Sequence, residues 1–296
     1  MELADLVTEQ LRPELVDLDL RPTSELVRLM ADDQKAALEA VADVFDAISA
    51  AVEAVHARLE GGGRLVYVGA GTAGRLGLLD AAECPPTFNT DRVVGVMAGG
   101  PTAFNVPREA VEDDAAAGAA DLELLEVTAS DAVVGLSASG RTPYTIGAVE
   151  RARELGAVTV GVSCNPDSLL SRKVDYPIEV LVGPEVIAGS TRLKAGTAQK
   201  TVLNIISTVT MVRLGKTFGN LMVDLRASND KLRDRARRIV IQATGADQRR
   251  VDEVLAEAKG EVKLAIVMLL GGLEAATARE RLEAHGGVVR KALATQ

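Results

Sequence analysis

The sequence of 296 residues has very little of several residue types on which common functions depend. Aromatic residues make up 2% of it and tryptophan is absent, which argues against a surface that stacks the bases of single-stranded nucleic acid. Two cysteines are too few for a disulfide scaffold, so a reducing compartment, by default the cytoplasm, is expected. The two histidines, His56 and His285, lie far apart without metal-ligand spacing, and no metal site is predicted.

An excess of basic charge and a long apolar run are missing as well. Lysine and arginine total 33 against 42 aspartates and glutamates, a formal net charge of -9, which argues against binding to nucleic acid. The acidic start at Glu2 and Asp5, with no apolar core after it, predicts that there is no secretion signal. The longest apolar run, from Leu264 to Leu273, is about half of what a bilayer requires, so no membrane span is predicted.

Short apolar runs alternate with helical segments in the middle of the chain. Five such runs are bounded by Gly, Pro, Ser or Asn and are too short for helices: Arg64–Val68, Arg92–Met97, Ala132–Leu136, Val158–Ser163 and Tyr176–Leu181. The segments between them are long enough for crossover helices. This pattern predicts an α/β fold, in which helices sandwich a mainly parallel sheet and ligands bind beyond the carboxyl ends of its strands.

Helical patterns flank the predicted sheet on both sides. Apolar residues recur at helical spacing from Pro22 to Leu59. Beyond Asn229 the strand pattern ends, and a charged helix followed by about three short amphipathic helices is predicted. We therefore expect three segments: an N-terminal helical segment (1–54), a sheet domain (55–229) and a small all-helical domain (230–296).

A glycine-rich loop follows the first predicted strand. Its sequence, Gly69-Ala-Gly-Thr-Ala-Gly-Arg75, has the spacing of a dinucleotide-binding turn, but no acidic residue ends the second strand, so no nicotinamide or flavin cofactor is predicted. The N–H groups at Gly71 and the Thr72 hydroxyl at a helix start still suit an anion. A purely structural turn is the alternative.

The third predicted strand ends in a loop rich in hydroxyl groups, Ser137-Ala-Ser-Gly-Arg-Thr-Pro143. Ser137, Ser139 and Thr142, with Arg141 beside them, lie where a helix begins. Hydroxyls combined with helix N–H groups predict a phosphate site that needs no metal. The alternative is that a hydroxyl, most easily that of Thr142, only caps the helix.

A similar loop, Gly189-Ser-Thr-Arg-Leu-Lys194, follows the fifth predicted strand. The hydroxyls of Ser190 and Thr191 and the ammonium group of Lys194 suit an anion or the hydroxyls of a sugar. In the alternative interpretation, Ser190 or Thr191 simply caps the long helix that follows.

Two carboxylate positions are candidates for acid–base chemistry. Pro85 should end the preceding helix near Glu83, and the negative end of the helix dipole would then make Glu83 hold its proton more tightly, as a general acid requires. Glu109 and Glu112, three residues apart, should share one face of the helix after the second strand. A solvated helix-end glutamate and an acidic surface patch are the respective alternatives.

These residues together resemble the N-acetylmuramic acid 6-phosphate etherase family over nearly the whole chain. The matching blocks are Gly69–Arg75, Leu79–Pro86, Ser139–Tyr144, Ser163–Pro166, Gly189–Lys200, Phe218–Asp224 and His285–Gly287. The resemblance implies the SIS fold, a parallel-sheet sandwich that binds phosphosugars, followed by a small helical domain, in a cytoplasmic homodimer of bacterial cell-wall recycling. One departure is Ala73, where many members have serine; Ser137, often alanine in the family, would compensate.

The resemblance also implies a reaction, cleavage of the lactyl ether of N-acetylmuramate 6-phosphate to N-acetylglucosamine 6-phosphate and D-lactate. By motif, its two acidic residues correspond to Glu83, the proton donor, and Glu112. In the open-chain sugar the C2 proton is acidic because it neighbours the C1 aldehyde, and its removal expels lactate from C3 before water adds. We expect Glu83 to serve the leaving oxygen and the water, and Glu112 the C2 proton, with neither metal nor cofactor.

Two other functions of the same fold stay open at this point, because fold alone does not decide function. A sugar-phosphate isomerase would interconvert aldose and ketose and would release no lactate. A regulatory protein would bind a phosphosugar without turnover. The expected partners are a phosphorylated amino sugar and a second copy of the chain, and neither nucleic acid nor a membrane.

Overall fold

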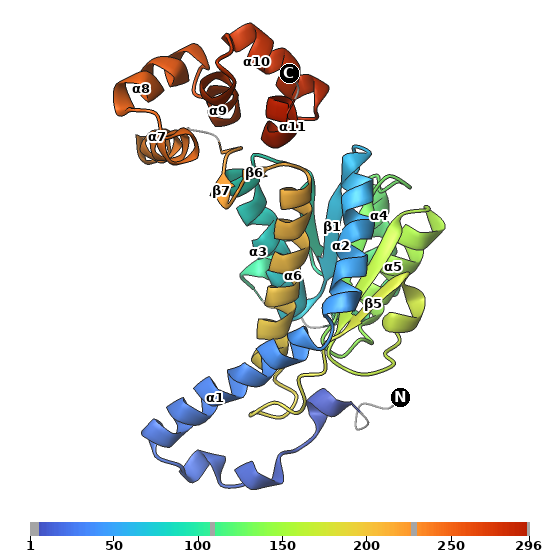
Figure 1. Ribbon diagram of the computed structural model, residues 1–296. Coiled ribbons are helices and arrows are strands. Elements are labelled where there is room, and N and C mark those ends of the chain that lie inside the picture. The colour runs from blue at the N-terminus through green and yellow to red at the C-terminus, as the bar shows by residue number, and fades with distance from the viewer. Residues whose placement is uncertain (1–5, 107–109, 226–229, 295–296) are drawn as a thin grey trace. The chain divides into compact units, whose positions relative to one another are not determined.

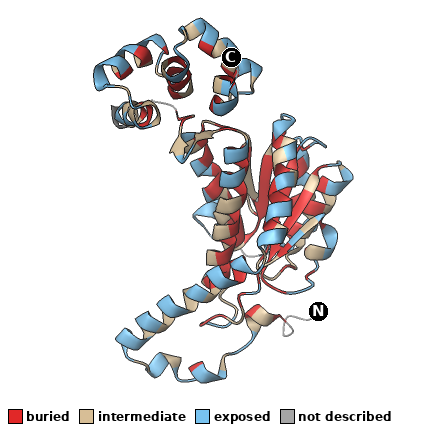
Figure 2. Ribbon diagram, viewed as in Figure 1, coloured by how far each residue is buried: buried red, intermediate tan, exposed pale blue. Residues whose placement is uncertain are grey.

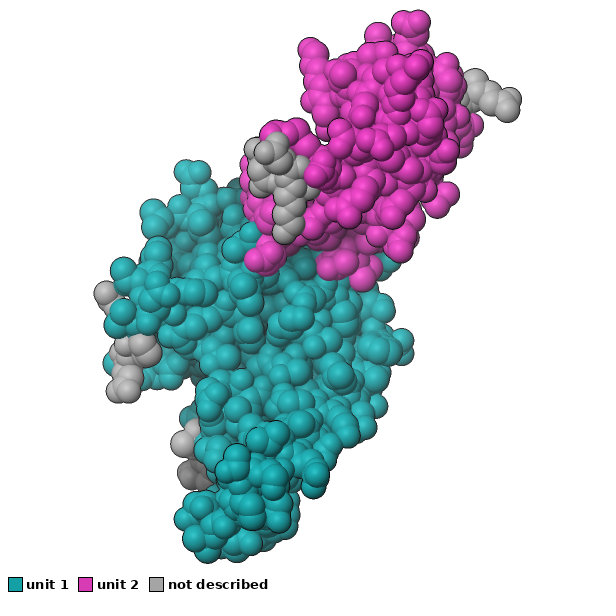
Figure 3. All heavy atoms as spheres, turned by 90° about the vertical axis from the view of Figure 1, so that its left-hand side faces the viewer, with its two compact units in different colours: residues 1–82, 92–207 teal, residues 83–91, 208–296 magenta. Residues whose placement is uncertain are grey.

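The computed structural model describes residues 6–106, 110–225 and 230–294 of the chain. The chain forms two compact units, which Figure 3 shows in different colours: unit 1, residues 1–82 and 92–207, and unit 2, residues 83–91 and 208–296. Each unit is therefore assembled from two separate stretches of sequence. The expected division near residues 54 and 229 stays a prediction.

A five-stranded parallel sheet, in the order β2-β1-β3-β4-β5, lies at the centre of unit 1. Its strands are β1 (Leu65–Gly69), β2 (Val93–Met97), β3 (Ala132–Leu136), β4 (Val158–Ser163) and β5 (Tyr176–Glu179). All five predicted strands are confirmed. Every residue of β1 and β3 is buried, as the unbroken apolar runs indicated for strands covered on both faces.

Helices cover both faces of this sheet (Figure 1). Helices α2 (Phe45–Glu60), α3 (Gly71–Phe88) and α6 (Lys194–Arg213) lie on one face, and α4 (Ala115–Leu124) and α5 (Pro143–Glu154) lie on the other. The predicted sandwich is thus confirmed. The chain changes faces between β1, which leads into α3, and β3, which leads into α5. The carboxyl ends of these neighbouring strands therefore form the switch point at which ligands bind in such sheets.

Close packing of α4 on α5 holds the amino end of α5 at this switch point. Gly118 and Gly147 have no side chains at the contact between the two helices. A Cβ atom on Gly118 would lie 2.0 Å from the carbonyl oxygen of Tyr144, and one on Gly147 would lie 2.1 Å from that of Ala115. The two helices thus touch through their backbones, which leaves α5 little freedom to shift.

The N-terminal region with helical spacing forms two helices. Helix α1 (Thr23–Ala42) is followed by α2, and three short 3₁₀ turns precede α1. Figure 2 shows that α1 and these turns are mostly exposed, whereas α2 is buried along the side that faces the sheet. Large apolar side chains are exposed in this region at Leu20, which belongs to the third turn, and at Leu11 and Val16, which lie between the turns.

Unit 2 is mainly helical. Its helices are α7 (Asp230–Thr244), α8 (Gln248–Glu257), α9 (Val262–Gly271), α10 (Ala275–Ala284) and α11 (Val289–Ala294), and a hairpin of β6 (Thr217–Phe218) and β7 (Leu221–Met222) precedes them. Between residues 246 and 294, the last that the structure describes, there are therefore four helices, where about three were predicted. The strands of the hairpin are too short to give a sequence pattern.

The longest apolar run of the sequence forms the core helix of unit 2. Six residues of α9 are buried, and α7, α8, α10 and α11 pack around it. A helix that is apolar on all sides is typical of such a central position. No helix among the described residues is both long and apolar enough to cross a membrane.

Candidate active site

The glycine loop forms a tight turn at the switch point. Gly71 begins α3 with a φ of +54°, a conformation that favours glycine. The turn packs against itself, because a Cβ on Gly74 would lie 2.6 Å from the carbonyl oxygen of Gly69. Thr72 is half-buried, and its hydroxyl makes no hydrogen bond to any residue that the structure describes. The turn therefore offers backbone N–H groups and one hydroxyl to a ligand.

The serine loop leaves the neighbouring strand and gathers its three hydroxyls. Ser137 Oγ lies 2.8 Å from Thr142 Oγ1 and 3.2 Å from Ser139 Oγ, and it accepts a hydrogen bond from the N–H of Gly140 at 3.0 Å. Thr142 is the N-cap residue of α5 but makes no side-chain capping bond, so the capping alternative for Thr142 is wrong. Nη1 of Arg141 is buried and has no hydrogen-bond partner in the described part of the chain. The loop therefore holds several donors that a phosphate would satisfy.

Glu112 lies beside the glycine turn. Its Oε2 atom is 3.9 Å from the position that a Cβ on Gly71 would occupy. Glu112 belongs to the 3₁₀ turn Val111–Asp113 that precedes α4, so its expected place on an α-helix is wrong. The extended backbone of Asp114, the N-cap residue of α4, separates this turn from α4. Its side chain is exposed and makes no ion pair with a described residue. Glu109 lies outside the described residues.

Glu83 lies inside α3 rather than at its end. The helix continues through both prolines to Phe88, and Asn89, with a φ of +49°, follows it. The expectation that Pro85 ends the helix is therefore wrong. A proline costs the helix one N–H donor, but burial of Cys84 and Phe88 on the same turns favours the helical path. Glu83 is exposed and has no ion-pair partner among the described residues.

The length of α3 separates Glu83 from the glycine turn. Glu83 lies twelve residues after Gly71 on this helix, which at about 1.5 Å per residue is ~18 Å along its axis. Glu112 is beside Gly71, at the start of the helix. Within one copy, the structure therefore brings Gly71, Thr72 and Glu112 together at the switch point and places Glu83 three turns away.

The amino end of α6 is capped by an acidic residue that the sequence pattern did not indicate. The carboxylate of Glu185 accepts hydrogen bonds from the N–H groups of Lys194, at 3.2 Å, and Ala195, at 2.9 Å. Burial raises the pKa of Glu185. The capping role considered for Ser190 and Thr191 thus belongs to Glu185, and neither hydroxyl bonds to a described residue. No local signal predicts this, because Glu185 is too distant in sequence for a capping motif.

Lys194 is buried among residues of the N-terminal segment. Its Nζ lies 3.3 Å from Oδ1 of Asp33, and the two side chains are 5% and 7% exposed. Arg12 also binds Asp33, at 2.6 Å. Two residues further along α6, a Cβ on Gly196 would lie 3.5 Å from Cγ2 of Thr72, so this end of α6 adjoins the glycine turn. A direct contact between Lys194 and a ligand stays a prediction.

The cysteines do not take part in this arrangement. Cys84 and Cys164 are free and buried, as small apolar residues are. Burial raises the pKa of Cys164 to about 12, with a further contribution from the charge of Glu185, so its thiolate is scarce at neutral pH. Among the described residues, no group of three or more His, Cys, Asp or Glu side chains is placed to hold a metal ion.

The chain matches two family models over residues 47–208 and known proteins over nearly its whole length. Residues 47–153 match the glucokinase regulatory protein N-terminal SIS domain, and residues 108–208 match the SIS domain. A protein of Rubrobacter xylanophilus named N-acetylmuramic acid 6-phosphate etherase is 62% identical, over 98% of this chain and 97% of its own. Proteins of the same name from Streptomyces avermitilis and Serratia proteamaculans are 58% and 52% identical, each over 99% of this chain and 95% and 99% of their own. The chain therefore belongs to the N-acetylmuramic acid 6-phosphate etherase family, as its sequence blocks predicted.

Proposed function

We propose that Glu83 and Glu112 carry the chemistry of this chain, which is an N-acetylmuramic acid 6-phosphate etherase and hence a carbon–oxygen lyase. The observation that carries the activity is the 62% identity to an etherase over 98% of the chain. The two carboxylates are supported by their chemistry. Both are exposed and make no ion pair with a described residue, so each is available to exchange a proton with a substrate.

In this proposal the serine loop holds the 6-phosphate of the amino sugar. Ser137, Ser139 and Thr142 already share one hydrogen-bonded cluster, and an arriving phosphate takes over their hydroxyl donors. The amino end of α5 adds backbone N–H groups and the positive end of its dipole. Arg141, whose Nη1 is unsatisfied in the described chain, adds charge. The Gly71–Thr72 turn on the neighbouring strand, and Ser190, Thr191 and Lys194 beyond it, complete the proposed binding set.

The reaction then needs two proton transfers and one water molecule. Glu112 removes the C2 proton of the open-chain sugar, the electron pair forms the C2–C3 double bond, and the C3–O bond to lactate breaks. Glu83 protonates the departing oxygen and afterwards removes a proton from the water that adds at C3. Protonation at C2 by Glu112 restores the acetamido sugar. Both carboxylates end in their starting states, and no electron donor or acceptor is required.

We further propose that each site combines residues of two copies of the chain. Within one copy, ~18 Å of helix separates Glu83 from the turn beside Glu112, which is too far for both to reach neighbouring carbon atoms of one sugar. In a symmetric dimer, Glu83 of one copy meets Glu112 of the other, and the reciprocal pair forms a second site.

An apolar groove in unit 1 supports the proposal that a second copy of the chain binds near Glu83. The groove has a volume of about 600 Å³ and is lined mostly by apolar residues of α3, β2, α4 and the segment after β2, with Leu79, Phe104 and Leu124 among them. It reaches Ala82, the residue before Glu83. Leu124 is 83% exposed in the single chain. A second copy that covers this groove removes apolar surface from water and approaches Glu83.

We expect the dimer to be directly measurable. Sedimentation equilibrium should give a species of about twice the 31.0 kDa of one chain. Leu124→Asp places a charge in the groove and should shift the protein towards the monomer, whereas Leu169→Asp, which changes an exposed leucine outside the groove, should not. A wild-type protein that sediments as a monomer would contradict the shared site.

The reaction itself is tested by the release of D-lactate. The purified chain should release D-lactate from N-acetylmuramic acid 6-phosphate and far less from unphosphorylated N-acetylmuramic acid, because the serine loop then has no anion to hold. Ser137→Ala should raise KM by about 10-fold, since a hydrogen bond to a charged group contributes about 1.5 kcal/mol or more. In labelled water, deuterium should appear at C2 and heavy oxygen at C3 of the amino sugar. Aldose–ketose interconversion without lactate would instead favour an isomerase, and binding without turnover a regulator.

We also propose a cytoplasmic location. The two cysteines are free and buried, a state that suits a reducing compartment. Fractionation of cells that produce the chain at native level, with the D-lactate assay as readout, tests this placement. Activity confined to a secreted or envelope fraction would contradict it.

A further inference from the structure

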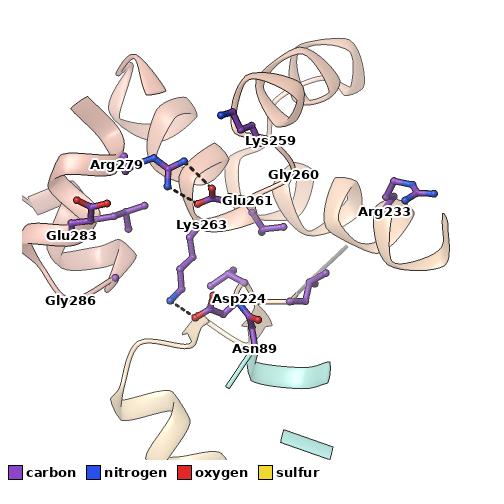
Figure 4. A pocket seen from close by; sticks show the side chains of 15 residues that line it. Asn89, Asp224, Arg233, Lys259, Gly260, Glu261, Lys263, Arg279, Glu283 and Gly286 are labelled. Atoms are coloured by element: carbon purple, nitrogen blue, oxygen red, sulfur yellow. Dashed lines mark hydrogen bonds and ion pairs between the residues drawn. The ribbon is translucent and has the colours of Figure 1, made fainter. Parts of the chain in front are cut away.

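A second cavity lies wholly within unit 2 and shares no residue with the switch point. Its volume is about 970 Å³, which lies within the range of small-molecule sites. It is open to solvent, and residues of α9 and α10 and the segments beside them line most of it (Figure 4). Its wall carries both charged side chains and apolar ones, the latter including Val223, Val262 and Leu282.

A carboxylate on the wall of this cavity is shared by two lysines, of which Lys263 also lines the cavity. Oδ2 of Asp224 lies 2.8 Å from Nζ of Lys263 and 2.9 Å from Nζ of Lys216. The side chains are largely buried, with exposed fractions of 20% for Asp224, 14% for Lys263 and 17% for Lys216. One negative charge therefore faces two positive charges where water screens them only partly, which leaves one positive charge uncompensated.

The titration of the cluster agrees with this shortage of negative charge. Burial lowers the pKa of Lys263, although the contact with Asp224 opposes that change. Burial also disfavours the carboxylate of Asp224, but its hydrogen bonds to Lys216 and Lys263 outweigh burial and keep its pKa below the ordinary value. A further anion beside Lys263 would stabilise its charged form.

The cavity leaves room for such an anion next to the Lys263 ammonium group. Gly287 adjoins it, and a Cβ there would lie 3.5 Å from Nζ of Lys263, so the missing side chain opens this approach. Gly286 and Gly287 have φ values of +61° and +75°, a conformation that disfavours other residues. One N–H of the ammonium group points to Asp224, and within the described part of the chain its two others have no partner and remain for a ligand.

Two other charges of the wall do not fill this role. Arg279 and Glu261 bind each other through two hydrogen bonds of 3.0 and 2.9 Å, so they largely neutralise each other. Figure 4 shows this pair apart from the contact between Lys263 and Asp224. Lys263 is a largely buried cation on the wall and lies beside Gly287, while the apolar wall suits the carbon body of a ligand.

We propose that this cavity binds a small organic anion, a carboxylate or a phosphate monoester, through the ammonium group of Lys263. Both chemistries occur in the products of the proposed reaction, D-lactate and N-acetylglucosamine 6-phosphate, so the site would respond to the output of the enzyme. The site itself does not depend on the roles of Glu83 and Glu112.

The test is a titration of the full chain followed by nuclear magnetic resonance of its valine and leucine methyl groups. Val262 and Leu282 report on the cavity. Inorganic phosphate, D-lactate, N-acetylglucosamine 6-phosphate and uncharged N-acetylglucosamine are added separately. The methyl signals of Val262 and Leu282 should shift in a saturable way with D-lactate if the site takes a carboxylate, or with phosphate and N-acetylglucosamine 6-phosphate if it takes a phosphate group. They should not shift with the uncharged sugar. The responses to phosphate and to D-lactate show whether the site prefers a phosphate group or a carboxylate.

Three variants assign the binding to Lys263. Lys263→Met should weaken anion binding at least about 10-fold, Lys263→Arg should keep it within a few-fold because the charge remains, and Lys35→Met, an exposed lysine of α1, should change nothing. Lys263→Met leaves Asp224 paired with Lys216, so no buried carboxylate loses its last cation. No response of Val262 and Leu282 in the wild type, or an equal response in Lys263→Met, overturns the proposal, whatever the D-lactate assay gives.

Discussion

Glu83→Gln is expected to lower kcat for D-lactate release by about 10²–10⁴-fold, the usual contribution of a positioned acid or base. Glutamine keeps the size and the hydrogen-bonding capacity of the side chain but has no proton to give to the leaving oxygen. The lactate alkoxide is a poor leaving group without that proton, so the elimination step itself slows. The affinity for N-acetylglucosamine 6-phosphate, measured by calorimetry, should change little, because the phosphate loops are untouched.

A matched substitution separates this effect from a general loss of acidic charge. Glu60 is an exposed glutamate in the last turn of α2, so Glu60→Gln makes the same chemical change away from the switch point and should retain wild-type turnover. Unaltered lactate release from Glu83→Gln would remove Glu83 from the mechanism. A loss of affinity equal to the loss of turnover would point to damaged binding instead.

The second large effect is a recovery of activity when two inactive variants are combined. Glu83→Gln and Glu112→Gln are each expected to be nearly inactive alone. If they are produced together with different affinity tags and purified as a mixed dimer, one site contains both altered residues and the other contains Glu83 of one copy and Glu112 of the other. This mixed dimer should show about half of the wild-type kcat per dimer.

The reciprocal mixed dimer provides the control. One copy is wild type, and the other carries both Glu83→Gln and Glu112→Gln, so each shared site contains one altered carboxylate. This dimer should be nearly inactive. If both residues instead served a site within one copy, the results would be reversed: the first mixed dimer would be inactive and the second about half active.

The sequence predicted the sheet and its loops well because the relevant signals are local. A buried parallel strand is a short apolar run bounded by turn residues, and all five strands appear where these runs lie. The strand order places the loops after β1 and β3 side by side. Ser137, Ser139 and Thr142 consequently meet as expected, since all three belong to one loop.

What the sequence could not predict depends on contacts between distant segments. The salt bridge from Lys194 to Asp33 joins helices α6 and α1, which lie far apart in the sequence. Glu185 caps α6 from ten residues before Ala195, a spacing that is not a known capping motif. The path of α3 through Pro85 depends on how its buried residues pack, which outweighs the local preference of proline. Local sequence rules do not tell whether packing between distant segments will outweigh the preference of a single residue.

The cavity of unit 2 had a partial signal in the sequence. Two of the family-like blocks, Phe218–Asp224 and His285–Gly287, contribute residues to its wall. Neither block suggested a function by itself, because the contact between Asp224 and Lys263 depends on the folded position of α9. The sequence thus marked both walls of the cavity without indicating that they face each other.

The division of the chain into units imposes an order on its folding during synthesis. Glu83 opens the stretch 83–91, whose packing partners begin only at residue 208. On the ribosome, the sheet strands made in between can assemble first, while this stretch waits for the helices at the carboxyl end. A nascent chain that stops before those helices consequently keeps its phosphate loops but lacks the partners of the stretch that starts at Glu83. From the proposed roles of these residues, we expect premature termination to yield a protein that holds a phosphosugar without converting it.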